Sequence, residues 1–290
     1  MKINYAIGAF LCMLGCYACS SPKTEVKSPD GHIKMSFTLD ENGIPFYNVS
    51  VGDSLLIENS AMGFTEGNGV ALGEGFQIKS TTFDHKDEIW TQAWGENKKN
   101  RNHYNEMAVS LTNEDQVQLT LRFRVFDDGI GFRYEYTVPT VDSLLITDEL
   151  TTFRFHRDGT SWSIPASAET YELLYQQQPI SEVETANTPF TFKTADGVYG
   201  SIHEAALYDF PEMTLKQIGH YTLKAELAPW PDGIKARKGN HFTTSWRTIQ
   251  IAPEAVGLIN SSLILNLNDP CVLETTDWIR PLKYVGVWWG

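Results

Sequence analysis

Polar and apolar residues alternate along most of this chain, and that alternation constrains the fold more than any other feature. The runs that share it are 33–39, 47–51, 117–125, 132–138, 221–227 and 263–267. Strict alternation turns one set of side chains toward a core and the other toward water, as in half-buried antiparallel strands. No helical pattern as long as 12 residues is present. We therefore predict an all-β body, with short helical turns only at 60–64 and 169–175.

Turn sequences separate these runs. Asp127-Asp128-Gly129 lies between two of them, and Asp-Gly tolerates the positive φ that closes hairpins. This predicts a long hairpin over 117–138. Each strand has one apolar face, so a sandwich of two large antiparallel sheets fits the pattern. No repeat of fixed period is visible, which argues against a propeller.

Composition excludes several classes of protein. The chain has 290 residues, of which 42% are hydrophobic and 12% aromatic, enough for a large core and too many for a disordered chain. Its formal net charge is −13, which repels phosphate backbones, so we expect no nucleic-acid partner. Beyond the first twenty residues there is no apolar run long enough for a transmembrane helix.

The N-terminus has the pattern of an export signal. Lys2 precedes an apolar and small-residue stretch over 3–18. Cys16 and Cys19 each follow a small residue, as in the lipobox of a bacterial lipoprotein. We assign the lipid to Cys19, because a polar tether follows it; Cys16 is the alternative anchor, and an ordinary cleaved signal peptide is the alternative signal. The prediction is a signal peptide over 1–19 and a tether over 20–28.

The distribution of cysteines bears on their chemistry. Three of the 4 cysteines lie in the signal region, and the fourth is Cys271. A disulfide framework or a zinc cluster needs cysteines gathered within the folded domain, so neither is expected. We expect Cys271 to be a buried small hydrophobe rather than a catalytic thiol.

The search for catalytic motifs is mostly negative, since the chain lacks GxGxxG, P-loop, HExxH and GxSxG sequences. Glu169 and Glu172 are most simply a solvated acidic turn. Glu204, after His203 at the end of a strand-like segment, is by composition an exposed or capping carboxylate, with a calcium ligand as the minority interpretation. Arg247 is expected either to hold a carboxylate in a functional role or to form a structural ion pair.

Four tryptophans are candidates for stacking against sugar rings. For each one a core position is the simpler expectation, because aromatic side chains dominate protein cores. They are Trp90, Trp94, Trp230 and Trp246.

Short segments spread over nearly the whole chain carry a resemblance to a known family. They are 28–31 (SPDG), 90–95 (WTQAWG), 102–106 (NHYNE), 123–135 (FRVFDDGIGFRYE), 171–172 (YE), 203–207 (HEAAL), 228–230 (APW), 245–248 (SWRT), 265–268 (LNLN), 278–281 (WIRP) and 283–290 (KYVGVWWG). In this order they resemble the N-terminal region of glycoside hydrolase family 97, which comprises bacterial α-glucosidases and α-galactosidases. Ser245 replaces the family's usual Pro, and Leu282 its usual Gly. Both departures fall in turns and affect local geometry.

The resemblance implies an architecture. The family has an N-terminal β super-sandwich of the galactose-mutarotase type, a catalytic (β/α)₈ barrel and a small C-terminal β-domain. On this pattern 29–275 is the super-sandwich and 276–290 is a linker with the first barrel strand. The nearly continuous apolar run over 283–289 agrees with a buried parallel strand.

The resemblance also implies a function. The parent protein would be a calcium-dependent, exo-acting α-glycosidase that cleaves α-linked oligosaccharides. Its catalytic carboxylates would lie beyond residue 290, so this chain alone is expected to be inactive. Glu204 matches the one calcium ligand that the family's N-terminal domain supplies, and the barrel supplies the others. The expected partners are the oligosaccharide and the chain's own barrel, with membrane contact only through the lipid, in the periplasm or outer membrane of a Gram-negative bacterium.

Two other classes of function remain open. The chain is alternatively a free-standing carbohydrate-binding or scaffold lipoprotein of a glycan-utilisation system. A complete mutarotase-type enzyme would need a positioned acid and base, and no such pair is visible in the sequence. The sequence does not distinguish α-glucoside from α-galactoside, or inversion from retention, because both depend on carboxylates outside it.

Overall fold

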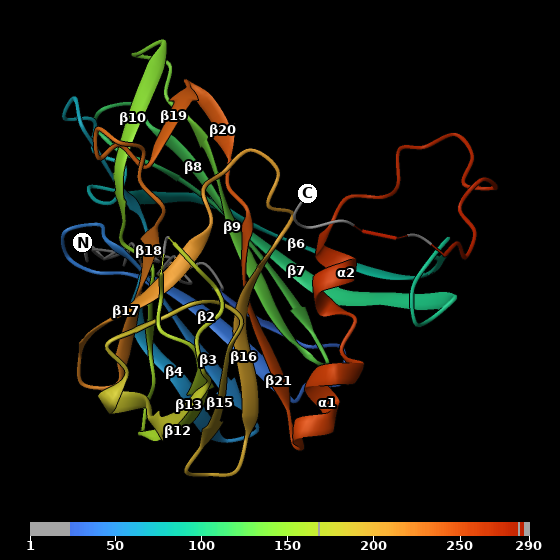
Figure 1. Ribbon diagram of the computed structural model, residues 1–290. Coiled ribbons are helices and arrows are strands. Elements are labelled where there is room, and N and C mark those ends of the chain that lie inside the picture. Colours follow the sequence, from blue (N-terminus) through green and yellow to red (C-terminus); the bar gives the residue numbers. More distant parts are fainter. Residues whose placement is uncertain (1–23, 168, 284, 287–290) are drawn as a thin grey trace, which may run out of the picture.

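The computed structural model describes residues 24–167, 169–283 and 285–286, and nearly all of its regular structure is antiparallel β (Figure 1). A ten-stranded sheet dominates the fold. In spatial order its strands are β13 (Gln176–Pro179), β12 (Gly159–Ser163), β15 (Phe190–Thr194), β16 (Tyr199–Ala205), β21 (Trp246–Ala252), β9 (Gly129–Thr137), β8 (Gln118–Phe126), β7 (Lys99–Thr112) and β6 (Gln77–Thr91), with β20 (His241–Thr243) also paired to β9.

Three smaller sheets accompany the ten-stranded sheet. The first contains β1 (Glu25–Lys27), β2 (Ile33–Leu39), β3 (Pro45–Val51) and β4 (Ser54–Ala61). The second contains β19 (Ala236–Gly239), β10 (Ser143–Glu149) and β5 (Phe64–Glu66). The third contains β11 (Thr152–Arg154), β18 (Thr222–Leu227), β17 (Met213–Gly219) and β14 (Thr185–Ala186), and the 3₁₀ helix η1 spans Ile180–Glu182.

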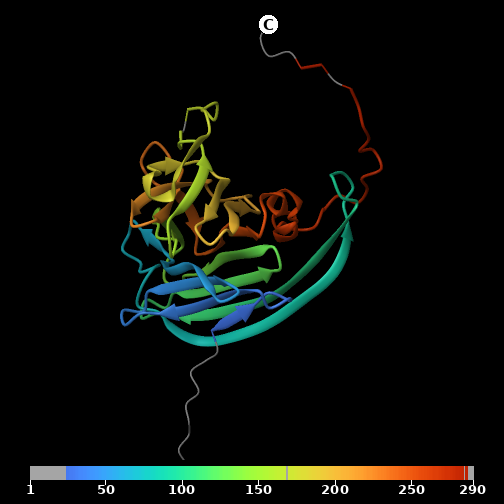
Figure 2. The same ribbon diagram turned by 90° about the horizontal axis from the view of Figure 1, so that it is seen from below.

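The main core lies between the ten-stranded sheet and the smaller ones. Aromatic rings meet across this layer: Phe37 of β2 lies 6.1 Å from Phe123 of β8, and Tyr47 of β3 lies 4.9 Å from Phe132 of β9, between ring centroids. In Figure 2 the blue β1–β4 sheet lies along the green strands of the large sheet. The prediction of an all-β, antiparallel fold is confirmed. The prediction of two large sheets is replaced by one ten-stranded sheet facing three smaller ones.

The predicted hairpin over 117–138 is confirmed. β8 and β9 pair from Gln118 opposite Thr137 to Phe126 opposite Gly129. Gly129 has φ +143°, a conformation that L side chains rarely adopt. The hairpin lies in the middle of the sheet, so its apolar face is covered by the core.

The alternating run at 263–267 forms a helix instead of the predicted strand. α1 (Ala255–Asn260) and α2 (Leu263–Leu267) lie on the outer face of the ten-stranded sheet (Figure 1). Leu263 and Leu267, four residues apart, join a second apolar cluster there with Trp246. Five residues are too few for alternation to exclude helical spacing, because positions i and i+4 are apolar in both patterns. Gly131 of β9 gives the helix room, since a Cβ there would lie 2.5 Å from Cδ1 of Leu267.

Other expectations also need correction. No helix forms at 60–64, where β4 ends at Ala61 and β5 begins at Phe64, or at 169–175, which is a loop. β1 lies within the segment assigned to the tether, and its Val26 is buried opposite Met35, so the folded part begins earlier than expected. Cys271 is exposed rather than buried, because it follows Pro270 beyond the last element that packs on the sheet.

The predictions made for the two ends of the chain fall largely outside the described residues. The proposed signal peptide, with Cys16 and Cys19, lies outside the described residues, and so do 284 and 287–290 of the expected barrel strand. Residues 283, 285 and 286 belong to no helix or strand. Among the described residues, no helix has the length and apolar character needed to cross a bilayer.

Candidate functional site

Strand pairing brings Glu204 and Arg247 together on the core face of the large sheet. β16 and β21 are antiparallel neighbours, with Glu204 opposite Arg247 and Ala205 opposite Trp246. Because successive side chains point to opposite faces, Trp246 joins the cluster under α2 on the outer face, while Arg247 points into the core. Local strand alternation therefore explains why a charged residue is buried here.

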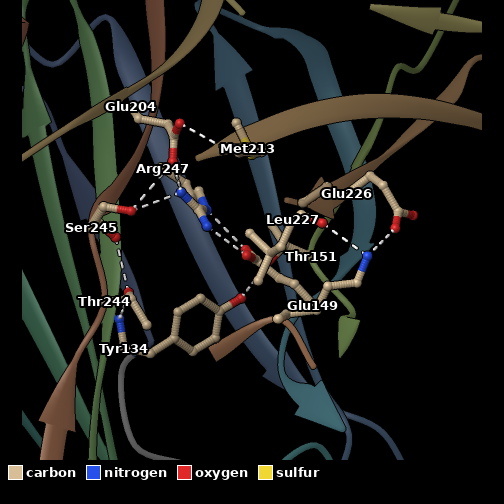
Figure 3. A network of polar contacts seen from close by, with 12 residues as sticks. Tyr134, Glu149, Thr151, Glu204, Met213, Glu226, Leu227, Thr244, Ser245 and Arg247 are labelled. Carbon is tan, nitrogen blue, oxygen red and sulfur yellow. Dashed lines mark hydrogen bonds and ion pairs between the residues drawn. The ribbon is translucent and has the colours of Figure 1, made fainter. Parts of the chain in front are cut away.

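Arg247 holds two carboxylates, one from each layer of the fold (Figure 3). Its Nε donates to Oε1 of Glu149 at 2.9 Å and its Nη2 to Oε2 of Glu149 at 2.5 Å, a bidentate pair. Its Nη1 donates to Oε1 of Glu204. Glu149 ends β10 in the facing three-stranded sheet, and the side chains of Arg247 and Glu149 are both fully buried. The triad therefore ties the two layers together.

Neighbouring polar groups complete the network around Glu204. The backbone N–H of Met213 donates to Glu204 Oε2 at 2.8 Å. The hydroxyl of Ser245 accepts from Arg247 Nη1 at 2.8 Å and donates weakly to Glu204 Oε1 at 3.4 Å. Both carboxylate oxygens of Glu204 are thus occupied by donors from this chain, as Figure 3 shows.

The electrostatics of the triad follow from one guanidinium serving two carboxylates. Burial raises the pKa of Glu204 above its ordinary value, and the nearby charge of Arg247 only partly offsets this. Burial works against the charge of Arg247 as well, but Glu149 and Glu204 outweigh it and raise the pKa of Arg247. Glu204 has a single bond from the guanidinium, whereas Glu149 has two. Glu204 therefore takes up a proton more readily than an exposed glutamate does.

The structure corrects the expectation for Glu204 and decides that for Arg247. By composition Glu204 was expected to be an exposed or capping carboxylate, but it is 6% exposed and ion-paired, because strand alternation turns it inward opposite Arg247. Arg247 forms a structural ion pair within the chain. Sequence reasoning missed Glu149, which lies 98 residues from Arg247 and in another sheet, and no local pattern marks it.

The described residues do not form a calcium site by themselves. A carboxylate is the right donor for Ca²⁺, but the ion needs about 6–8 oxygens, and both oxygens of Glu204 already accept hydrogen bonds. Within the part of the chain that the structure describes, no group of three or more His, Cys, Asp or Glu side chains is arranged to hold a metal. Any calcium site that uses Glu204 must be completed by other residues.

We expect Glu204→Gln to lower the free energy of unfolding by about 1–3 kcal/mol at pH 7. The amide of Gln has one acceptor oxygen and one donor nitrogen. Arg247 and the N–H of Met213 are both donors, so in either orientation the amide nitrogen faces one of them. Urea unfolding of the 290-residue chain measures the loss. Glu172→Gln is the matched control, because Glu172 is exposed and surface changes of this kind stay within about 0.5 kcal/mol. Equal stability of the two variants would contradict the burial argument.

The four tryptophans divide into two pairs. Trp246 is 1% exposed, and Cζ of Arg124 and Cζ of Arg133 lie 4.8 and 4.6 Å from its ring centroid. Trp90 donates its Nε1–H to Asn266 Oδ1 at 2.8 Å. These two are structural. Trp94 and Trp230 are 56% and 60% exposed, contrary to the core expectation.

The other candidate residues have plain roles. Glu169 and Glu172 are exposed in a loop, as expected for a solvated acidic turn. His203 points away from Glu204 along the strand, and its Nδ1 lies 3.1 Å from the hydroxyl of Thr188. Burial lowers the pKa of His203, so its neutral form is favoured.

Comparison with known proteins gives consistent results. Residues 26–270 match the family model described as "Glycosyl-hydrolase 97 N-terminal". A family 97 enzyme of Pseudoalteromonas sp. strain K8 is solved in one structure as an E480Q variant with panose and in another with acarbose. Each superposes with a TM-score of 0.85 at 39% identity, and the match covers 89% of this chain and 40% of that one. A "Probable retaining alpha-galactosidase" of Streptomyces bingchenggensis (strain BCW-1) is 24% identical over 245 residues, which are 83% of this chain and 37% of that protein.

Proposed function

Because the chain belongs to glycoside hydrolase family 97, as its N-terminal domain, we propose that it is the non-catalytic part of an α-glycosidase that cleaves α-linked oligosaccharides. The observation that carries the proposal is the family match over 26–270. The chain spans about 40% of the length of the solved relatives that it matches, so the catalytic residues are proposed to lie in further domains of the parent protein. The panose and acarbose complexes of the Pseudoalteromonas enzyme support α-linked oligosaccharides as substrates.

The two buried carboxylates bound to Arg247 support the non-catalytic role. Glu149 and Glu204 are the carboxylates enclosed with Arg247, and both are bound to its guanidinium. A glycosidase needs two carboxyl groups facing the scissile bond, one of them able to give up a proton to the leaving oxygen. Neither group meets that need while it is held inside the domain, so the chain is proposed to act as a support for a catalytic domain.

We expect the 290-residue chain alone to show no turnover of aryl α-glucosides or aryl α-galactosides, because the acid and the nucleophile or base of the reaction are proposed to lie in the catalytic domain of the parent protein. The parent protein, read through the gene beyond codon 290, should hydrolyse one of the two. Release of the coloured phenol measures both. Clear hydrolysis by the purified chain would contradict the proposal, and so would a reading frame that ends without a catalytic domain, which would favour the free-standing binding protein.

We also propose that Glu204 lends one carboxylate oxygen to a calcium ion whose other ligands belong to the catalytic domain. The support is the family membership together with the donor type of Glu204. The same assay tests it: with Glu204→Gln in the parent protein, the calcium concentration that gives half-maximal turnover should rise. Superimposable calcium curves for the parent and the variant would leave Glu204 as a purely structural partner of Arg247.

A lipid anchor on Cys19 is proposed from the sequence pattern that precedes it. Expression of the full chain in a bacterial host with a palmitate analogue should label it, and Cys19→Ala should abolish the label. Cys16→Ala is the control and should leave the label in place. Loss of the label in Cys16→Ala alone would move the anchor to that cysteine, and no label in any variant would indicate a cleaved signal peptide.

A further inference from the structure

A pocket of about 890 Å³ is lined by two loops of the domain. One loop follows β16 and the other follows β18. Phe210 lines the pocket, and its ring centroid lies 5.8 Å from Cζ of Arg247, so the pocket is next to the buried triad. Its volume is within the range of small-molecule sites, about 300–1,000 Å³.

Two exposed aromatic rings line this pocket. Trp230 is 60% exposed and Tyr208 is 66% exposed. Large apolar rings left open to water in a concave site indicate a surface that another molecule covers. A planar ring with an open face suits a ligand that also has a flat apolar face.

The backbone of Trp230 and the hydroxyl of Tyr208 are held by bonds within the chain. The backbone N–H of Trp230 donates to Ile234 O at 2.8 Å, and that of Gly233 donates to Trp230 O at 2.8 Å, which closes a turn. Pro229 and Pro231 flank Trp230 and fix φ on either side of it. The hydroxyl of Tyr208 accepts from the N–H of Asp269 at 3.1 Å. A site ordered in advance loses less entropy on binding.

Each cation that lines the pocket has a carboxylate partner. Lys235 Nζ lies 2.7 Å from Oε1 of Glu226, a residue outside the lining. Lys238 Nζ lies 2.9 Å from Asp209 Oδ2, and Arg237 is ion-paired to Asp232. Because each cation already has a carboxylate, neither a phosphate nor a polycation is favoured. The exposed oxygens and N–H groups of these pairs can still bond to hydroxyl groups. The pocket therefore suits an uncharged ligand that is rich in hydroxyls and has apolar ring faces.

We propose that this pocket binds a neutral α-linked oligosaccharide, with one sugar ring stacked on Trp230 and its hydroxyls bonded to the Asp232–Arg237 pair. The chemistry of the lining indicates a sugar, and the choice of an α-linked sugar rests on the proposed function. The pocket gives this domain a direct part in holding the oligosaccharide.

Titration of panose into the 290-residue chain, followed by calorimetry, tests the proposal. Panose should bind, and Trp230→Ala should weaken binding at least about tenfold, since aromatic anchors carry most of the affinity of such sites. Trp94→Ala is the matched control, because Trp94 is similarly exposed but lies in the loop between β6 and β7. It should leave the affinity unchanged. Asp232→Asn, which keeps the aromatic ring, should also weaken binding.

The outcomes separate this proposal from the one on which it rests. No binding at millimolar panose, or equal affinity of Trp230→Ala and Trp94→Ala, overturns the pocket assignment even if the parent protein hydrolyses α-glycosides. Binding that depends on Trp230 upholds it even if the parent protein shows no turnover. Panose binding to the chain but not to the parent protein would make the pocket a contact between domains, and would overturn the proposal. Thermal melting of each variant checks that it is folded.

Discussion

Arg247→Met should lower the free energy of unfolding by about 3–5 kcal/mol, because it leaves two buried carboxylates without their cation. Glu149 is fully buried and Glu204 is 6% exposed, so water cannot replace the guanidinium. Urea unfolding of the 290-residue chain measures the loss. The triple variant Arg247→Met, Glu149→Gln, Glu204→Gln should regain part of it, because it removes both charges. A loss below about 1 kcal/mol for the single variant would mean that the site admits water.

The stability lost in Arg247→Met should depend on pH. The pKa of Glu204 is already raised by burial, so the folded chain binds this proton more readily than the unfolded chain. Such a group favours folding below its unfolded pKa, and that contribution is lost as the pH rises through the folded pKa. Without Arg247 the pKa of Glu204 should rise further. The stability gap between the original chain and Arg247→Met should therefore narrow as the pH falls from 7 toward about 4, and a constant gap would contradict the explanation.

Gly129→Ala should lower the free energy of unfolding by about 2–4 kcal/mol, because it adds backbone strain and a steric clash. Gly129 has φ +143°, and a Cβ there would lie 2.2 Å from the carbonyl oxygen of Ile249 on the neighbouring strand. Neither backbone can move without breaking the pairing of β9 with β21. Urea unfolding again gives the loss.

Gly197→Ala is the control for the strain alone. Gly197 has φ +90°, and nothing lies within 4 Å of a Cβ built there. This variant should lower the free energy of unfolding only by the effect of the strain, about 1–2 kcal/mol. The difference between the two losses in free energy of unfolding measures the effect of the clash. Equal losses would mean that β9 and β21 move apart at little cost.

Alternation and turn residues predicted the strands because both are local. The hairpin of β8 and β9 follows from its apolar face and from Gly129 at its turn. Five residues at 263–267 do not separate a strand from a helix by pattern. The helix forms because the sheet has room for Leu263 and Leu267 beside Gly129 and Gly131. These glycines lie more than a hundred residues earlier in the chain.

The candidate site was only partly accessible to sequence reasoning. Its single-residue features, Glu204 at the end of a strand and Arg247 after a tryptophan, were visible as possible charged partners. Their burial was not, because it depends on strand register and on Glu149 from another sheet. The exposure of Trp230 was hidden for a similar reason: composition favours the core for any tryptophan, and only the turn that fixes Trp230 turns it outward.

The contact of α2 with the β6–β7 strands has a consequence for the order of folding. The side chain of Asn266 accepts from Trp90 and donates to the carbonyl of Arg101, across sequence separations of 176 and 165 residues. Closing loops of this length comes late, because their entropy is lost before the contact forms. On the ribosome, the parts of β6 and β7 that contain Trp90 and Arg101 are made early. They can contact Asn266 only after residue 266 has emerged. A late element of this domain thus completes one of its early long hairpins.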